Sequence, residues 1–209
     1  MIQGKQFYSS TINSRLQKVR MPSGVVVNAF KIGHSTLYDL LDSASEVAPE
    51  KVFIIDDNGK QYTFSDLKLE ADTFASKLAN EYEVARGSVV GLLIFNSFEI
   101  CALFLALNKL GAIAVPLATK LRHEKIQYLV DYAELDCIIY SDKYDDWFGG
   151  DSDSQLESIS LNSLKDTESS LGQHLIHKTL PYEPETLRFA DAAMFMTSGT
   201  TGASKKVLL

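Results

Sequence analysis

The stretch Met196-Thr197-Ser198-Gly199-Thr200-Thr201-Gly202-Ala203-Ser204-Lys205 places five hydroxyl groups, two glycines and a lysine directly after the apolar run 192–196. An apolar run of this length before a polar loop predicts a buried strand that ends at the loop. The two glycines permit positive φ, so consecutive backbone N–H groups can turn inward and form a concave anion site. The stretch therefore predicts an anion-binding loop.

The side chains of this loop indicate which anion it binds. Ser198, Thr200 and Thr201 add hydroxyl donors to the backbone N–H groups, and Lys205 adds a full positive charge at the rim. These groups favour a polyphosphate over a neutral sugar or a lipid tail. The alternative is a surface turn that is rich in Ser, Thr and Gly.

The loop is not an ordinary P-loop. That pattern requires Gly-Lys followed by Ser or Thr, and the corresponding places hold Ser204, Lys205 and Lys206. The residues 206–209 predict the start of a strand, so we expect no helix dipole behind the phosphate. Backbone donors, hydroxyls and lysine remain as the predicted ligands.

The pattern Thr-Ser-Gly-Thr-Thr-Gly-x-x-Lys resembles the phosphate-binding signature of the adenylate-forming superfamily, which includes acyl- and aryl-CoA synthetases, luciferases and nonribosomal adenylation domains. Two positions differ: Ser204 stands where the family usually has proline, and Lys206 where it has glycine. The resemblance implies one strand-end residue that sets the loop, Thr197, and six phosphate-binding positions. These positions are Ser198, Gly199, Thr200, Thr201, Gly202 and Lys205.

Composition limits the possible classes of protein. The 209 residues are 45% hydrophobic, which is enough for a buried α/β core, and the net charge of -7 without a basic cluster disfavours nucleic-acid binding. The longest apolar run, 100–107, is too short for a membrane span of about 20 residues. We expect a cytoplasmic protein, because no signal peptide is apparent and Cys101 and Cys137 lie in apolar surroundings typical of buried thiols.

The hydrophobic pattern predicts alternating helices and strands. Thr36 is expected to cap one helix with Asp39 three residues on, and Thr63 to cap a second helix with Asp66. Asn96 and Glu99 are expected to cap a third helix, which stops at Gly111. The expected strands are 51–56, 61–63, 89–95, 113–115 and 136–140, with a possible strand at 25–27, and a further helix is expected at 123–133. This order predicts an α/β fold, a doubly wound and mostly parallel sheet with flanking helices.

We divide the chain into four parts. They are an N-terminal arm (1–35), an α/β subdomain (36–148), a polar loop or insertion (149–185), and the incomplete strand–loop–strand segment 186–209. The order of elements in 36–140, together with 192–209, resembles the N-terminal subdomain of adenylate-forming enzymes. The chain is thus interpreted as the front part of a longer enzyme.

Two smaller clusters receive no catalytic role. His174 and His177 have no third ligand nearby, so no metal site is predicted. Tyr144, Trp147 and Phe148 are expected to anchor a segment to the sheet rather than to stack on bases.

The resemblance implies a reaction for the parent enzyme: a carboxylate attacks the α-phosphate of ATP, with Mg²⁺, and coenzyme A then takes the acyl group. A fatty or aromatic acid is the implied substrate. Two alternatives remain open, namely a nonribosomal adenylation domain that loads a carrier protein and a non-catalytic nucleotide- or protein-binding remnant. No catalytic acid or base is assigned, and we expect the 209 residues alone to be inactive.

Overall fold

The computed structural model describes residues 16–20, 24–30, 36–148, 156–166, 193–197 and 205–208. The chain divides into two compact units, Met1–Ser35 and Thr36–Leu209. Each unit is described by itself below.

The N-terminal unit (residues 1–35) contains an antiparallel pair, β1 (Leu16–Arg20) and β2 (Val26–Phe30), in which Arg20 lies opposite Val26. Gly24 has a φ of 83°, a left-handed conformation that glycine adopts at little cost, and its carbonyl accepts a hydrogen bond from Arg20 Nη1 at 3.1 Å. The sequence predicts part of β2, but it does not predict β1.

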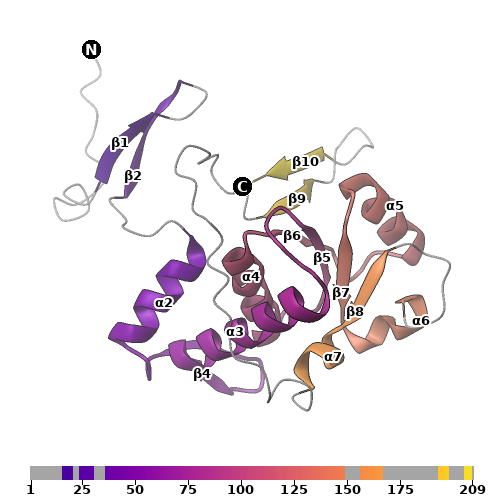
Figure 1. The fold of residues 1–209 in the computed structure, drawn as a ribbon, viewed down its shortest axis with the longest axis horizontal. Coiled ribbons are helices and arrows are strands. Elements are labelled where there is room, and N and C mark those ends of the chain that lie inside the picture. Colours follow the sequence, from indigo (N-terminus) through magenta and orange to yellow (C-terminus); the bar gives the residue numbers. More distant parts are fainter. Residues whose placement is uncertain are drawn as a thin grey trace. The chain divides into compact units, whose positions relative to one another are not determined.

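The second unit is built on a parallel sheet (Figure 1). Its strands are β5 (Val89–Leu93), β6 (Ile113–Pro116), β7 (Cys137–Tyr140) and β8 (Glu157–Ser160), in the order β6-β5-β7-β8. All three pairings are parallel. The predicted doubly wound α/β fold is therefore confirmed.

Helices cover both faces of the sheet. One face packs against α3 (Phe64–Glu81), α4 (Phe98–Leu110) and α7 (Leu161–Lys165), and α2 (Leu37–Val47) packs on α3 and α4. The other face packs against α5 (His123–Ala133) and α6 (Asp145–Phe148), which follows the short helix η1 (Asp142–Tyr144). Side chains of β5 alternate between the faces: Leu92 joins the α4-side core and Leu93 the α5-side core. Both faces of the central strand are thus buried, as its continuous apolar run predicts.

Local signals determine several boundaries. Thr36 with Asp39 and Thr63 with Asp66 form complete capping boxes at the starts of α2 and α3. Gly111 ends α4 in the left-handed conformation, with a φ of 70°. These predictions are confirmed, as is the hairpin of β3 (Val52–Ile55) and β4 (Gln61–Thr63).

The predicted cap of α4 is wrong. The N-cap residue is Ser97 rather than Asn96, and its side chain makes no capping hydrogen bond. The hydroxyl oxygen of Ser97 is buried and has no hydrogen-bond partner among the described residues. The spacing between Asn96 and Glu99 predicts Asn96 as the cap, but the helix begins one residue later than that spacing requires.

The face that α2 buries is only partly apolar. Leu41 is buried, whereas Leu37 and Leu40 are 47% and 39% exposed, and the helix instead buries Tyr38 and Ser45. Tyr38 can turn inward because its hydroxyl and its backbone N–H both find partners there, which are described below. Polar partners therefore rotate the helix away from its purely apolar face.

The segment predicted as a polar loop or insertion contains regular structure. Within 149–185 the described residues 156–166 form β8 and α7, with Ile159 and Leu164 fully buried in the α4-side core. A loop is thus the wrong interpretation of 157–165. Two buried residues, Ile159 and Leu164, anchor this part. In a segment rich in Ser, Asp and Glu, two apolar residues are too few to produce a hydrophobic pattern that predicts a strand or a helix.

No helix among the described residues has both the length and the apolar character needed to cross a membrane. The cytoplasmic location stays a prediction.

Candidate functional site

The strand–loop–strand predicted at the end of the chain is present as the antiparallel pair β9 (Met194–Thr197) and β10 (Lys205–Leu208). Thr197 and Lys205 are direct partners in this pair, and Met196 pairs with Lys206. The seven residues 198–204 therefore connect two paired strand ends. A loop closed in this way has a fixed width at its base.

The described residues place this pair beside β6. Ala193 and Ala114 form a parallel bridge, which sets β9 next to β6 on the side away from β5. Met194 is buried in the α5-side core, and Phe195, the next residue, is 41% exposed. Because β9 runs parallel to β6, the loop after Thr197 leaves at the carboxyl edge of the sheet.

The carboxyl edge also contains the point where the chain changes faces. The connection after β5 leads to α4 on one face, and the connection after the adjacent strand β6 leads to α5 on the other. Ligands of open α/β sheets usually bind at such a point, outside the carboxyl ends of the strands. The loop 198–204 begins one strand away from it.

The structure describes two of the seven predicted site residues, namely the strand-end residue Thr197 and one of the six phosphate-binding positions, Lys205. Thr197 ends β9 and Lys205 begins β10, so the backbone brings these two together. Ser198, Gly199, Thr200, Thr201 and Gly202 lie outside the described residues. Their phosphate-binding role therefore stays a prediction, as does that of Lys205.

Contacts along the carboxyl edge tie its segments together. The hydroxyl of Tyr144, after β7, donates to the carbonyl of Thr119, after β6, at 2.8 Å. Burial raises the pKa of Tyr144, although this hydrogen bond acts in the opposite direction. Lys143 Nζ lies 5.1 Å from the ring centroid of Phe95, which follows β5. Sequence analysis did not group these residues, because only the strand order shows that their segments are neighbours.

The aromatic cluster behind the edge packs as expected. Tyr144 and Phe148 are buried in the α5-side core, and the rings of Tyr144 and Trp147 are 4.9 Å apart. His123 stacks on Trp147 at 4.9 Å between ring centroids. This packing supports the predicted anchoring role.

A second polar cluster lies away from the carboxyl edge, where α2, α3 and α4 meet. Tyr38 donates its hydroxyl to Asp72, which also accepts from Lys68 at 2.9 Å and Lys109 at 2.7 Å. The backbone N–H of Tyr38 donates to Asn108 Oδ1 at 2.9 Å. Burial raises the pKa of Asp72, but the hydrogen bonds from Lys109, Tyr38 and Lys68 outweigh it, so the pKa lies below its ordinary range. Lys68 also pairs with Asp42 at 3.1 Å, so two carboxylates face two ammonium groups, and this balance of charge indicates a structural role.

The cysteines show no sign of chemistry. Cys137 is buried in β7, and burial raises the pKa of its thiol to about 12, so the reactive thiolate is rare at neutral pH. The expected burial of Cys101 is wrong, because this residue is exposed on α4; partial burial of its thiol still raises the pKa of Cys101. Among the described residues, His, Cys, Asp and Glu form no group of three that suits a metal ion. His174 and His177 lie outside the described residues.

The chain has a parallel sheet, and a closed loop of characteristic sequence lies at the carboxyl edge of that sheet. Comparison with known proteins identifies the family to which such a chain belongs. The family model described as AMP-binding enzyme matches residues 41–209. The chain belongs to the AMP-binding enzyme family, which is adenylate-forming.

Relatives within the family include two kinds of protein. The 2-succinylbenzoate–CoA ligase of Bacillus cytotoxicus is 25% identical over 175 residues, covering 83% of this chain and 33% of the ligase. The hybrid PKS-NRPS synthetase apdA of Emericella nidulans is 26% identical over 177 residues, covering 84% of this chain and 4% of the synthetase. The chain thus spans a third or less of these relatives.

A solved structure agrees with the fold. The N-terminal subdomain of Klebsiella oxytoca NpsA, in complex with 3-hydroxybenzoyl-AMSN, superposes with a TM-score of 0.65 at 25% identity. The match covers 84% of this chain and 41% of that chain. The predicted N-terminal subdomain of the adenylate-forming fold is therefore confirmed.

Proposed function

We propose that this chain is the N-terminal part of an ATP-dependent ligase that activates a carboxylic acid as its acyl adenylate and then transfers the acyl group to coenzyme A. The observation that carries the proposal is the family match through residue 209, which includes the loop between the paired residues Thr197 and Lys205. Similarity to an acid–CoA ligase supports the acceptor.

The composition of the loop fits the triphosphate of ATP. Two glycines and three hydroxyl residues follow Thr197 within five positions. Ser198, Thr200 and Thr201 would donate to phosphate oxygens, and Lys205 would neutralise charge on the departing pyrophosphate. Gly199 and Gly202 would let the backbone approach closely. Thr197 would set the width of the loop through its pairing with Lys205.

Mg²⁺ and coenzyme A are part of this proposal, but no described residue is assigned to either. Magnesium bound to the triphosphate would reduce the negative charge that the loop must offset. The acid is proposed to be fatty or aromatic, and the residues that select it are not identified in this chain.

A second candidate function rests on a different relative. Similarity to a hybrid PKS-NRPS synthetase favours an adenylation domain that passes its acyl group to a carrier protein. The activation step is the same, and only the acceptor thiol differs. A non-catalytic member that keeps the fold and the loop is the third candidate.

The test is acid-dependent exchange of pyrophosphate into ATP, measured on a protein extended to the length of the relatives. Exchange with a fatty or aromatic acid is expected, and its absence across a broad panel of acids would favour the non-catalytic candidate. Product analysis with coenzyme A and with a carrier protein then separates the first two candidates. The 209-residue chain alone should show no exchange, because phosphate contacts do not position the reacting oxygens. Such positioning lowers the reaction barrier by about 7–11 kcal/mol.

A further inference from the structure

We propose that the N-terminal unit (residues 1–35) binds anionic lipid surfaces through the cations and exposed valines of the β1–β2 hairpin. The sequence places five of the 20 Lys and Arg residues in this unit and none of the 27 Asp and Glu residues. The unit therefore carries a formal charge of +5, and the rest of the chain carries -12. Charge segregation of this size indicates a separate electrostatic role for the unit.

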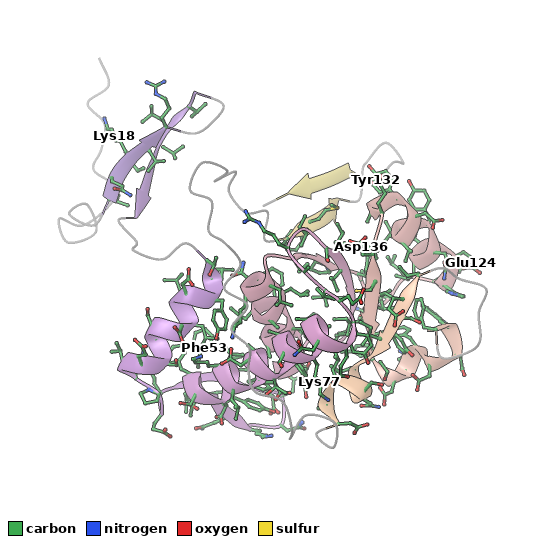
Figure 2. All side chains as sticks on the ribbon, viewed as in Figure 1. Lys18, Phe53, Lys77, Glu124, Tyr132 and Asp136 are labelled. Carbon is green, nitrogen blue, oxygen red and sulfur yellow. The ribbon has the colours of Figure 1, made fainter. Side chains whose placement is uncertain are left out.

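The hairpin presents both parts of a lipid-binding surface. Val25, Val26 and Val27 are 57%, 49% and 37% exposed, and Arg20 lies directly opposite Val26. Lys18 is exposed two residues further along β1 (Figure 2). The valines lie at the end of the hairpin that begins at Gly24; Arg20 is level with Val26, and Lys18, opposite Asn28, lies further from that end.

The spacing matches the interface of a bilayer. A strand rises about 3.3 Å per residue, so Lys18 lies about 7 Å behind Arg20 along β1. Apolar groups of peripheral proteins enter the boundary between headgroups and acyl chains to a depth of about 5–10 Å. When the valines reach that boundary, the two cations would meet the anionic headgroups.

The exposed side chains favour lipid over nucleic acid. Both surfaces attract cations, but single-stranded nucleic acids also need aromatic rings on which bases stack. Phe7, Tyr8 and Phe30 belong to this unit, but their side chains lie outside the described ones; the side chains described as exposed and apolar are valines, which a bilayer boundary buries and a phosphate backbone does not. An isolated two-stranded hairpin is also marginally stable in water, so it gains from an apolar environment on its exposed side.

The test is sedimentation of the 209-residue chain with vesicles. Binding is expected to phosphatidylcholine vesicles that contain phosphatidylserine and not to phosphatidylcholine alone, and added salt should weaken it. Lys18→Gln with Arg20→Gln should weaken binding about 30-fold, about fivefold for each cation near the surface. Val25→Ser should weaken it about threefold to tenfold, because a half-exposed valine is lost from the interface.

Matched controls separate this surface from general charge effects. Lys51→Gln with Arg86→Gln removes two exposed cations from the second unit and should leave binding unchanged. Arg20→Lys should also retain binding, because it keeps the charge. The single variant Lys18→Gln removes one cation and leaves the Arg20–Gly24 hydrogen bond intact. Equal sedimentation with both kinds of vesicle, or equal loss in the control, would overturn the proposal. Tighter binding to RNA that is unaffected by Val25→Ser would assign the hairpin to nucleic acid instead.

Discussion

Thr197 and Lys205 lie directly opposite each other in the β9–β10 pair, at the two ends of the phosphate-binding loop proposed above. Lys206 lies one pair further from the loop, opposite Met196. The bridge between Ala193 and Ala114 fixes β9 to the parallel sheet. The loop thus has a base held by a sheet, which suits a site that must hold phosphates without rearranging.

Thr197 is expected to act through this pairing rather than through its hydroxyl. Thr197→Val keeps a β-branched residue in the strand and should leave the KM for ATP within about twofold, whereas Thr197→Gly weakens the strand by about 1 kcal/mol and should raise that KM. Exchange kinetics on the extended protein measure both. A large loss with Thr197→Val would mean that the hydroxyl contacts the nucleotide.

The polar cluster around Asp72 should be worth more to stability than the exposed ion pair beside it. Asp72→Asn leaves the half-buried Lys109 without a carboxylate partner and Lys68 with Asp42 alone, and should cost about 2 kcal/mol of unfolding free energy. Asp42→Asn removes only the Lys68 pair at 3.1 Å, which is more exposed, and should cost less than about 1 kcal/mol.

Urea titration gives both free energies. Tyr38→Phe is expected to fall between the two variants, at about 1 kcal/mol, because one hydroxyl is removed and every charge keeps a partner. Equal costs for Asp72→Asn and Asp42→Asn would contradict the structural role of the cluster.

The capping box of α3 makes a prediction that depends on pH. Two hydrogen bonds from Thr63 lower the pKa of Asp66 below its ordinary value of 3.8, and the bond from the backbone N–H has a larger effect than the bond from the side chain. A carboxyl whose folded pKa is depressed stabilises the fold above its unfolded pKa and loses that contribution as the pH falls through the folded pKa. Thr63→Ala should therefore cost about 1 kcal/mol near neutral pH and less below pH 3.8.

Unfolding curves at several pH values measure this cost. Thr73→Ala, which removes a hydroxyl within the same helix, is the matched control and should show a smaller cost with no such pH dependence. If the cost of Thr63→Ala is the same at every pH, the hydroxyl of Thr63 does not stabilise the ionised Asp66.

Lys77 is expected to hold the segment 156–166 against α3. Its side chain is buried, and Nζ donates to the carbonyls of Ser163 and Asp166 at the end of α7 (Figure 2). Lys77→Met keeps the packed stem but removes both bonds, so amide exchange in α7 should accelerate by an amount equivalent to about 1–3 kcal/mol.

The neighbouring Lys165 provides the control for that experiment. Lys165→Met breaks only the partly exposed pair with Glu99 at 2.6 Å and should change exchange by less than about 1 kcal/mol. Equal acceleration of amide exchange in both variants would show that the buried Lys77 holds α7 no more strongly than the exposed Lys165 pair does.

Local and periodic signals in the sequence were sufficient for most of the fold. The capping boxes at Thr36 and Thr63, the stop at Gly111 and the apolar faces of α3 and α5 depend on residues within a few positions of one another. The phosphate-binding loop was recognised for the same reason, because its glycines, hydroxyls and lysine are contiguous in the sequence.

Features that depend on distant partners were missed. Tyr38 turns inward because Asn108 and Asp72 meet it there, 70 and 34 residues away in the sequence. β8 forms because β7 offers a parallel edge, although its own composition is polar. The positive charge of the N-terminal unit does not show in the net charge of -7, because that value also includes the acidic remainder of the chain.

Acid-dependent exchange of pyrophosphate into ATP by the extended protein, with Lys205→Ala compared against Lys206→Ala, tests the central claim most directly. The proposal predicts that Lys205→Ala slows exchange by an amount equivalent to about 1–3 kcal/mol, because a charge-assisted contact to the departing pyrophosphate is lost. Lys206→Ala should have a smaller effect, because Lys206 lies one pair further from the loop. An unchanged rate for Lys205→Ala at both limiting and saturating ATP would contradict the assignment of this loop to the triphosphate.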